Sequence, residues 1–456
     1  MKTKTPICDF VRHYSEGKIK RWHMPGHKGK GPLGIEALDL TEVAGADSLY
    51  EANGIIRESE EIASTLFDAH TFYSTEGSSQ CIRAMLHLAK TQAWSQKKHP
   101  LVWAARNAHK AFLSAAALLN IDVDWLYGSN EDSYLSCSLS PCELEQMLQK
   151  AANLPTALYL TSPDYLGNVA DVAALAEVCH RWGVLLLVDS AHGAYLKFLE
   201  PSLYPTDLGA DICCSSAHKT LPVLTGGAYL HLSKNVDASM LDAAKNAMAL
   251  FGSTSPSYLI LQSLDAANAY LAKDCRQNLA YTVAKLDELK KRLAAHGYRL
   301  VGNEPLKITL ATKSSGYTGI DFASHLRENG IECEFADNDF VVLMPSTDMG
   351  TEELAHLEMV ATSLPQKEPI TVTPPTPAKA ERVLRINYAL LWPSETVAVE
   401  DSIGRILASP SVSCPPAVPI LMCGEKIDEA AVRAFRYYGV EKLRVVIELD
   451  KHLDKL

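Results

Sequence analysis

The feature that most constrains the fold is an uninterrupted apolar run, Val184 to Val188, which ends at the carboxylate of Asp189. A strand with apolar side chains on both sides is buried on both faces, as in a parallel sheet covered by helices. A carboxylate at the end of such a strand is costly to desolvate unless a cation or a hydrogen-bond donor compensates it. We therefore expect Asp189 to have a chemical role at the edge of a buried sheet.

The chain around this run alternates between short apolar stretches and helical patterns. The predicted strands are 101–105, 157–160, 210–214 and 225–230. The predicted helices are 56–67, one from 80 onward and 171–182. This alternation predicts an α/β fold with a mainly parallel sheet, which binds its ligands at the carboxyl ends of the strands.

The chain is predicted to have five segments. An entry segment covers 1–55 and a large domain 56–285, and a long helical stretch from Pro256 to about His296 leads into a small α+β domain, 286–364. Strands of the small domain are expected near Ile308, Cys333 and Val342. Five prolines between 365 and 378 indicate an extended linker, 365–380, before a C-terminal module, 381–456.

Bulk properties exclude several kinds of partner. The formal charge of -11 argues against nucleic acid or an anionic membrane and suits a cationic substrate. Eleven cysteines without a Cys-x-x-Cys pair indicate neither a metal site nor a disulfide framework. The amino terminus has no apolar core of signal-peptide length and no later run approaches a membrane span, so a cytoplasmic location is expected.

Lys219 follows Ser216-Ala217-His218 between two predicted strands, so we expect it on a strand-end loop. A lysine alone there is most often an exposed cation. With a strand-end Asp189 and His192 nearby, it matches what pyridoxal 5'-phosphate requires. The amine forms a Schiff base, and the carboxylate keeps the ring nitrogen protonated so that the ring accepts electrons from the substrate's α-carbon.

With these residues placed, the chain resembles the bacterial ornithine/lysine/arginine decarboxylases, pyridoxal-phosphate enzymes of the aspartate-aminotransferase fold (fold type I). The motifs that carry the resemblance, in order, are Trp22–Gly29, Thr75–Ser79, Arg106–Lys110, Val188–Gly193, Ser216–Lys219, Ser253–Tyr258 and Pro415–Pro419 with Gly424-Glu425. Any one of them is weak, because short motifs recur by chance, but seven in order across nearly the whole chain form a strong signal.

The resemblance implies a set of cofactor-binding residues: Gly77, Ser78, Ser79, His109, Asp189, His192, Ser216, His218, Lys219, Thr254 and Ser255. Gly77-Ser78-Ser79 would open a helix, whose free amides favour a phosphate; the alternative is a plain serine N-cap. His109 is expected to stack on the cofactor ring, and Lys219 or His218 to deliver a proton to the α-carbon. Catalytic roles thus fall on Lys219, His109, Asp189 and His218.

The implied reaction is decarboxylation of a basic amino acid, most simply arginine to agmatine in polyamine synthesis, with lysine or ornithine next. His27, with Lys28, lines the active-site entrance in one interpretation and stabilises a turn in the other. Glu425 either receives the cationic end of the substrate or is a surface carboxylate. Departures from the family pattern leave the substrate open: Ser190, Asn387, Cys414, Ala417 and Cys423.

The family's longer members carry an extra amino-terminal domain used in large assemblies, which is missing here. A homodimer or higher homo-oligomer with shared active sites is therefore expected, in which Thr254 and Ser255 reach the neighbour's phosphate. Two other functions stay open: an aminotransferase or β-elimination lyase of the same fold, and a non-catalytic binding protein. Retention of Lys219, Asp189 and His109 argues against the last.

Overall fold

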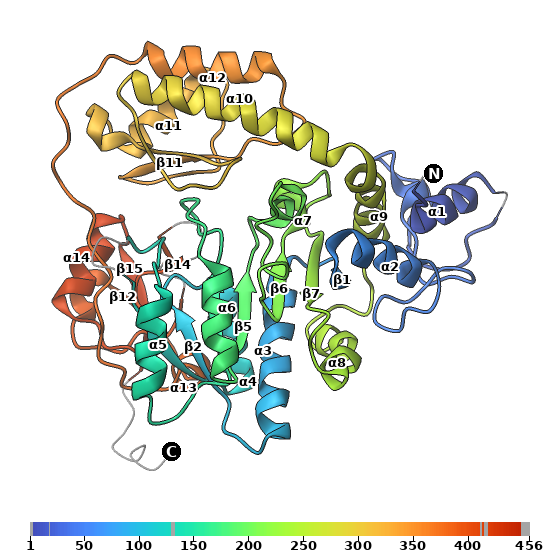
Figure 1. The fold of residues 1–456 in the computed structure, drawn as a ribbon, viewed down its shortest axis with the longest axis horizontal. Coiled ribbons are helices and arrows are strands. Elements are labelled where there is room, and N and C mark those ends of the chain that lie inside the picture. The colour runs from blue at the N-terminus through green and yellow to red at the C-terminus, as the bar shows by residue number, and fades with distance from the viewer. Residues whose placement is uncertain (1–2, 18, 129–132, 411–412, 415–417, 448–456) are drawn as a thin grey trace. The chain divides into compact units, whose positions relative to one another are not determined.

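The computed structural model describes residues 3–17, 19–128, 133–410, 413–414 and 418–447 (Figure 1). The chain divides into two units. The first consists of Met1–His99, Leu148–Pro163 and Asp171–Ala284, and the second of Pro100–Met147, Asp164–Ala170 and Lys285–Leu456. The five-segment division predicted from the sequence stays a prediction.

The main sheet has seven strands in the order β1-β7-β6-β5-β4-β2-β3. Their bounds are β1 (His70–Ser74), β2 (Leu101–Ala105), β3 (Asp122–Leu126), β4 (Ala157–Thr161), β5 (Leu185–Asp189), β6 (Ile212–Ser215) and β7 (Ala228–Leu232). The pairs β2–β3, β4–β5 and β5–β6 are parallel, whereas β7 is antiparallel to both of its neighbours, β6 and β1. The predicted α/β fold with a mainly parallel sheet is confirmed.

The buried strand β5 occupies the middle of the first unit. Leu186, Leu187 and Val188 have no exposed surface, and Asp189 at the strand's end is 2% exposed. In the paired register, Asp189 lies opposite Thr161 of β4 and Cys214 of β6. The carboxyl ends of three parallel strands therefore meet at one level, where side chains from different parts of the chain converge.

Helices of the first unit pack on this sheet and on one another. They are α1 (Pro6–Glu16), α2 (Ile55–Phe67), α3 (Ser78–Ser95), α6 (Val172–Arg181), α7 (Ala217–Thr220), α8 (Ala238–Ala249) and α9 (Tyr258–Lys273), with 3-10 turns η1 (Glu36–Leu38) and η2 (Ala194–Phe198). Helix α3 packs against β5, β6 and β7, while α1, α2 and α9 pack on one another and α2 also contacts β1.

The long helical stretch predicted from Pro256 to about His296 is helical in the structure. It is two helices, α9 and α10 (Cys275–Ala295), separated at Asp274. Aspartate is a poor residue for a helix interior and a good one at a helix start, and the Asp274 carbonyl accepts a bond from Asn278 N in the new helix. The helix α10 begins in the first unit and ends in the second.

The second unit contains a four-stranded antiparallel sheet in the order β10-β11-β9-β8. Its strands are β8 (Arg299–Val301), β9 (Ile308–Ala311), β10 (Phe335–Ala336) and β11 (Phe340–Leu343), and Figure 1 shows α10, α11 (Gly319–Glu328) and α12 (Thr351–Ser363) on one face of it. The strand expected near Cys333 is β10, which begins two residues later at Phe335, opposite Val342 of β11.

Residues 365–380 contain neither helix nor strand and lead to the C-terminal part of the second unit. That part consists of α13 (Ile386–Leu391), β12 (Ser394–Ala398) paired with β15 (Lys442–Val446), η4 (Val399–Ser402), β13 (Ser413–Cys414) paired with β14 (Val418–Pro419), and α14 (Glu429–Tyr437). Its core includes Leu407, Leu421, Phe435 and Val445. The predicted motif residues Pro415, Pro416 and Ala417 lie outside the described residues.

Three further elements of the second unit complete the described structure: α4 (Lys110–Leu119), η3 (Thr312–Ser315) and α5 (Pro141–Lys150), the last of which ends in the first unit. Within the described ranges, no helix is both long enough and apolar enough to cross a lipid bilayer.

Candidate active site

In the first unit, the Asp189 carboxylate is held by hydrogen-bond donors from three directions. Its Oδ2 accepts a bond from the Tyr159 hydroxyl at 3.0 Å, and its Oδ1 accepts bonds from Ala191 N at 3.1 Å and from Cys214 Sγ at 3.5 Å. Burial, with Asp189 adding to it, raises the pKa of Tyr159 far above its ordinary value. Tyr159 therefore remains a phenol and a donor, and the buried carboxylate is satisfied without a protein cation.

Lys219 lies within reach of a histidine from the loop that follows Asp189. Its Nζ is 3.0 Å from Nε2 of His192, which is 4% exposed. The lysine itself is in the one-turn helix α7 and not in a loop as predicted, because four residues are too short for a helical pattern to be visible in sequence. The amine of Lys219 in α7 and the imidazole of His192 in the β5–η2 loop are therefore in contact.

The imidazole of His218 faces a different group. Its Nδ1 is 2.9 Å from the carbonyl oxygen of Gly227, and its backbone N–H bonds to the same carbonyl at 3.2 Å. Because a carbonyl only accepts, Nδ1 carries the hydrogen. The amine of Lys219 is instead within hydrogen-bond distance of His192.

Gly77, Ser78 and Ser79 lie at the start of α3, where Gly77 is the N-cap with φ +71°. No side chain caps this helix, so the alternative of a serine N-cap is wrong. A Cβ added at Gly77 would meet nothing within 4 Å, and Ser216 Oγ donates to Ser78 Oγ at 2.9 Å. A helix N-terminus with open space and hydroxyls beside it favours an anion such as phosphate.

The segment that contains Thr254 and Ser255 lies beside this helix start on its own chain. The backbone N–H of Ser253 bonds to Glu76 Oε1, immediately before Gly77, and both Thr254 and Ser255 are exposed. His27 lies elsewhere in the first unit, with Nε2 3.1 Å from Asp39 Oδ2 and Nδ1 accepting from Gly29 N at 3.0 Å. Both ring nitrogens of His27 contact nearby residues of the same segment, which favours a role in stabilising a turn over a role at the active-site entrance.

These residues fit pyridoxal 5'-phosphate. An amine, a buried carboxylate with an oriented phenol donor, and an uncapped helix start beside open space are the three groups that the aldehyde, the ring nitrogen and the phosphate of that cofactor need. Among the described residues, no cluster of histidine, cysteine and carboxylate side chains suits a metal ion.

Two family patterns match the chain: "Orn/Lys/Arg decarboxylase, major domain" over residues 5–303, and "Orn/Lys/Arg decarboxylase, C-terminal domain" over residues 375–448. The chain belongs to the Orn/Lys/Arg decarboxylase family. As a member of this family it is an amino-acid decarboxylase, and the resemblance inferred from seven motifs is confirmed.

Two arginine decarboxylases and one lysine decarboxylase structure are similar to this Orn/Lys/Arg decarboxylase over almost the whole chain. An arginine decarboxylase of Halalkalibacterium halodurans is 29% identical over 95% of this chain and 93% of its own length. One from Bacillus subtilis is 29% identical over 93% and 92%. A lysine decarboxylase structure from Francisella novicida superposes with a TM-score of 0.78 at 16% identity, covering 97% of this chain and 81% of its own, which shows a common fold.

In the second unit of this Orn/Lys/Arg decarboxylase, His109 is the N-cap of α4. Its Nδ1 accepts a bond from Ala111 N at 3.1 Å, which fixes the ring's rotation and leaves Nε2 to carry the hydrogen of the neutral form. Glu425, also in this unit, is 3% exposed and lies 3.9 Å from Arg106. It is therefore not a surface carboxylate.

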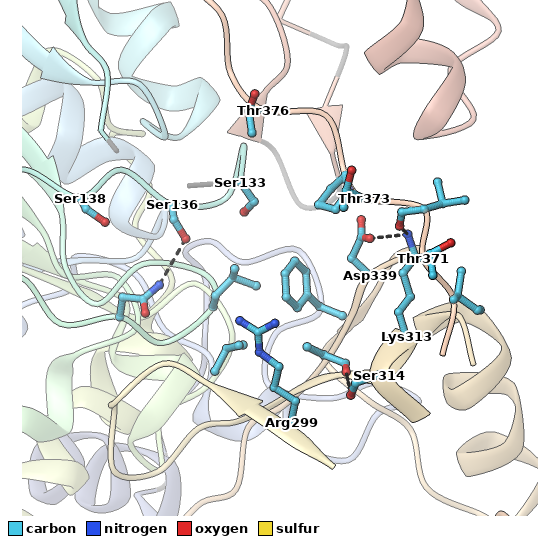
Figure 2. A pocket seen from close by; sticks show the side chains of 18 residues that line it. Ser133, Ser136, Ser138, Arg299, Lys313, Ser314, Asp339, Thr371, Thr373 and Thr376 are labelled. Carbon is cyan, nitrogen blue, oxygen red and sulfur yellow. Dashed lines mark hydrogen bonds and ion pairs between the residues drawn. The ribbon is translucent and has the colours of Figure 1, made fainter. Parts of the chain in front are cut away.

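Two roles could not be inferred from the sequence. One is that of Tyr159 as a hydrogen-bond donor to Asp189, and the other is that of Arg106 as the buried cation beside Glu425. Tyr159 belongs to an apolar strand and reaches Asp189 only through strand pairing, which no local pattern reveals. A cavity of about 570 Å³ in the second unit, shown in Figure 2, is lined by Arg299 and by Lys313, which is 2.7 Å from Asp339. None of the predicted site residues lines it.

Proposed function

We propose that this chain is a pyridoxal-phosphate-dependent decarboxylase whose substrate is arginine, with lysine and ornithine as the next choices. The observation that carries the proposal is the contact of Lys219 with His192, which follows Asp189, the buried carboxylate with its phenol donor, by three residues. The arginine decarboxylases that are 29% identical along nearly their full length support the choice of arginine over lysine.

In this proposal each group of the chain has one task. Lys219 holds the cofactor's carbonyl carbon, Asp189 its ring nitrogen, and Gly77, Ser78 and Ser79 with Ser216 its phosphate; His109 packs on the ring face. The bound cofactor supplies an electron sink for the pair left when the carboxylate departs. Thr254 and Ser255 contribute to the phosphate site of a partner subunit.

The overall reaction converts arginine to agmatine and carbon dioxide. The bond between the α-carbon and the carboxylate carbon breaks, and the α-carbon gains one proton. Lys219 and His192, 3.0 Å apart, are the pair that holds this proton in our proposal, since either nitrogen can carry it. Tyr159 keeps the Asp189 carboxylate oriented by its 3.0 Å hydrogen bond.

We extend the proposal to a cytoplasmic homodimer that serves polyamine synthesis. The cysteines whose side chains the structure describes are all free thiols, which suits a reducing compartment. The net charge of -11 suits a cationic substrate.

The test combines cofactor uptake with substrate choice. Purified protein is incubated with pyridoxal phosphate, its visible absorbance is recorded, and carbon dioxide release from arginine, lysine and ornithine is measured. Lys219→Ala is expected to lose both the visible band and carbon dioxide release, while Lys273→Ala, which removes an 81%-exposed lysine, retains both.

Release from arginine at a higher kcat/KM than from the other two amino acids supports the proposal. A protein that takes up the cofactor but releases no carbon dioxide from any of the three would overturn the substrate assignment and favour an aminotransferase or lyase. A protein that cannot bind the cofactor would overturn the proposal altogether.

A further inference from the structure

The loop between β2 and α4 is held by residues more than 300 positions later in the chain. Arg106, its first residue, is 3% exposed. Its Nη1 donates to the carbonyl of Pro419 at 3.0 Å and its Nη2 to the carbonyl of Ile420 at 2.7 Å. These bonds join the loop directly to the C-terminal part of the second unit.

Glu425 supplies the charge that the buried guanidinium needs. Its Oε2 is 3.9 Å from Arg106 Nη2 and accepts a bond from Met422 N at 2.8 Å, so the carboxylate is fixed in place. Burial raises the pKa of Glu425, and Arg106 acts in the opposite direction. Arginine stays charged in proteins, so loss of the carboxylate's charge would leave an uncompensated buried cation.

Other residues of the C-terminal part also hold the strand next to β2. Arg382 donates to the carbonyl of Val123 at 2.5 Å, and Arg385 Nε donates to Asp122 Oδ1 at 2.8 Å, both in β3. The backbone N–H of Arg106 in turn bonds to the carbonyl of Leu126, the last residue of β3, at 2.9 Å. The C-terminal part of the second unit therefore contacts both β3 and the loop that follows β2.

The loop that begins at Arg106 ends three residues later at His109. Within it, Ala108 N bonds to the Ala105 carbonyl at 3.1 Å, and Asn107 Nδ2 bonds to the Leu135 carbonyl at 3.3 Å. His109 then caps α4 through Nδ1. Each of the three residues of this turn thus has at least one hydrogen bond, so the turn transmits a displacement of Arg106 to the imidazole.

We propose that the Arg106–Glu425 pair positions His109 for catalysis, so that Glu425 is a positioning residue and not a substrate contact. This inference rests on the proposed function, because it takes His109 to be the residue that packs on the cofactor ring. Glu425 acts through Arg106 and the loop, and the C-terminal module is thereby part of the catalytic apparatus.

The test is Glu425→Gln in the full-length protein reconstituted with pyridoxal phosphate. Glu400→Gln is the matched control, because it makes the same change in the same module at an exposed pair, 3.1 Å from Arg436. The expected result is a fall in kcat of about 10- to 100-fold with KM for arginine nearly unchanged, and a weaker visible circular dichroism band of the bound cofactor. The control retains wild-type values.

A second measurement does not depend on the loaded enzyme. In the cofactor-free protein, Glu425→Gln is expected to shift the His109 imidazole resonances and to speed hydrogen exchange at the Ala111 amide, which His109 caps. Unchanged resonances and exchange, together with an unchanged kcat, would overturn the inference. A raised KM with unchanged kcat would also overturn it and restore Glu425 as a substrate contact.

If Glu425→Gln does not fold, the double variant Arg106→Met/Glu425→Leu replaces the pair with apolar side chains and leaves no lone buried charge. Loss of kcat in this folded protein supports positioning, and wild-type kcat overturns it. Failure of the proposed function is distinguishable, because the wild-type protein itself would then release no carbon dioxide.

Discussion

Nζ of Lys219 lies 3.0 Å from Nε2 of His192. An amine attacks a carbonyl only when it is uncharged, and a lysine alone is charged at neutral pH. A neutral imidazole at hydrogen-bond distance can accept the extra proton. In the proposed function, this contact would let the buried histidine accept the lysine's proton when the cofactor attaches.

We predict that His192→Gln attaches pyridoxal phosphate about 100-fold more slowly than the wild-type protein at neutral pH, because the amine loses its proton acceptor. The visible band is followed after mixing cofactor-free protein with the cofactor. His218→Gln serves as the comparison, since Nδ1 of His218 is bonded to the Gly227 carbonyl. Equal rates in the two variants would show that His192 has no part in this step.

Tyr159→Phe is expected to lower the free energy of unfolding by about 1.5–3 kcal/mol, because it removes a hydrogen bond to a buried carboxylate. Urea denaturation measures the change. Tyr229→Phe is the matched control: the Tyr229 hydroxyl is buried and bonds to nothing in the described part of the chain, so its removal should cost close to nothing. Equal losses in both variants would contradict the assigned bond.

Ser190→Ala is predicted to leave the free energy of unfolding unchanged or slightly higher. The Ser190 side chain is wholly buried, and its hydroxyl has no hydrogen-bond partner among the described residues. Ser216→Ala, by contrast, loses the bond to Ser78 and should cost about 0.5–1.5 kcal/mol. A destabilised Ser190→Ala protein would reveal a partner for this hydroxyl.

His231 should make the fold sensitive to acid. Burial, with a smaller effect of Lys197, lowers the pKa of His231 from 6.5 to about 3. The unfolded chain therefore binds a proton that the folded chain does not, and stability is lost as pH falls from 6.5 towards 3, by up to about 1.4 kcal/mol per pH unit. The stability of His231→Phe, measured by urea denaturation between pH 7 and 4, should depend less on pH.

An identical pH slope in wild type and His231→Phe would contradict this origin. The phenylalanine is suited to the position, because Phe67, Tyr204 and Tyr229 already surround the imidazole. The substitution removes the contact between His231 Nδ1 and Thr71 Oγ1 at 3.0 Å. This loss lowers the free energy of unfolding at every pH without changing its slope against pH.

The sequence predicted those parts of the fold that local patterns encode. The apolar run that ends at Asp189 is β5, and the strand before His109 and the helix that opens at Gly77-Ser78 were both placed correctly. The one-turn helix of Lys219 and the boundary at Asp274 were not predicted, because a single turn is too short to show a helical repeat and the boundary is one residue between two helical patterns.

Within the candidate site, the chemical groups could be predicted from sequence but their neighbours could not. Asp189, His192 and Lys219 stand out as polar residues beside apolar strands, whereas Tyr159 reaches the carboxylate from a neighbouring strand and Glu425 reaches Arg106 from the far end of the chain. Such partners are set by strand register and module packing, and nothing in a single sequence marks them.

The span of the Arg106 contacts has a consequence for biosynthesis. Its two carbonyl acceptors follow it by 313 and 314 residues, so a ribosome has made nine-tenths of the polypeptide before either exists. Until then the guanidinium must remain hydrated, and the turn that leads to His109 cannot close around it. A nascent chain that stops short of Pro419 would contain every proposed cofactor-binding group of the first unit, but the turn from Arg106 to His109 would lack its two carbonyl acceptors. Chaperones and proteases can distinguish such an incompletely folded chain from the complete enzyme.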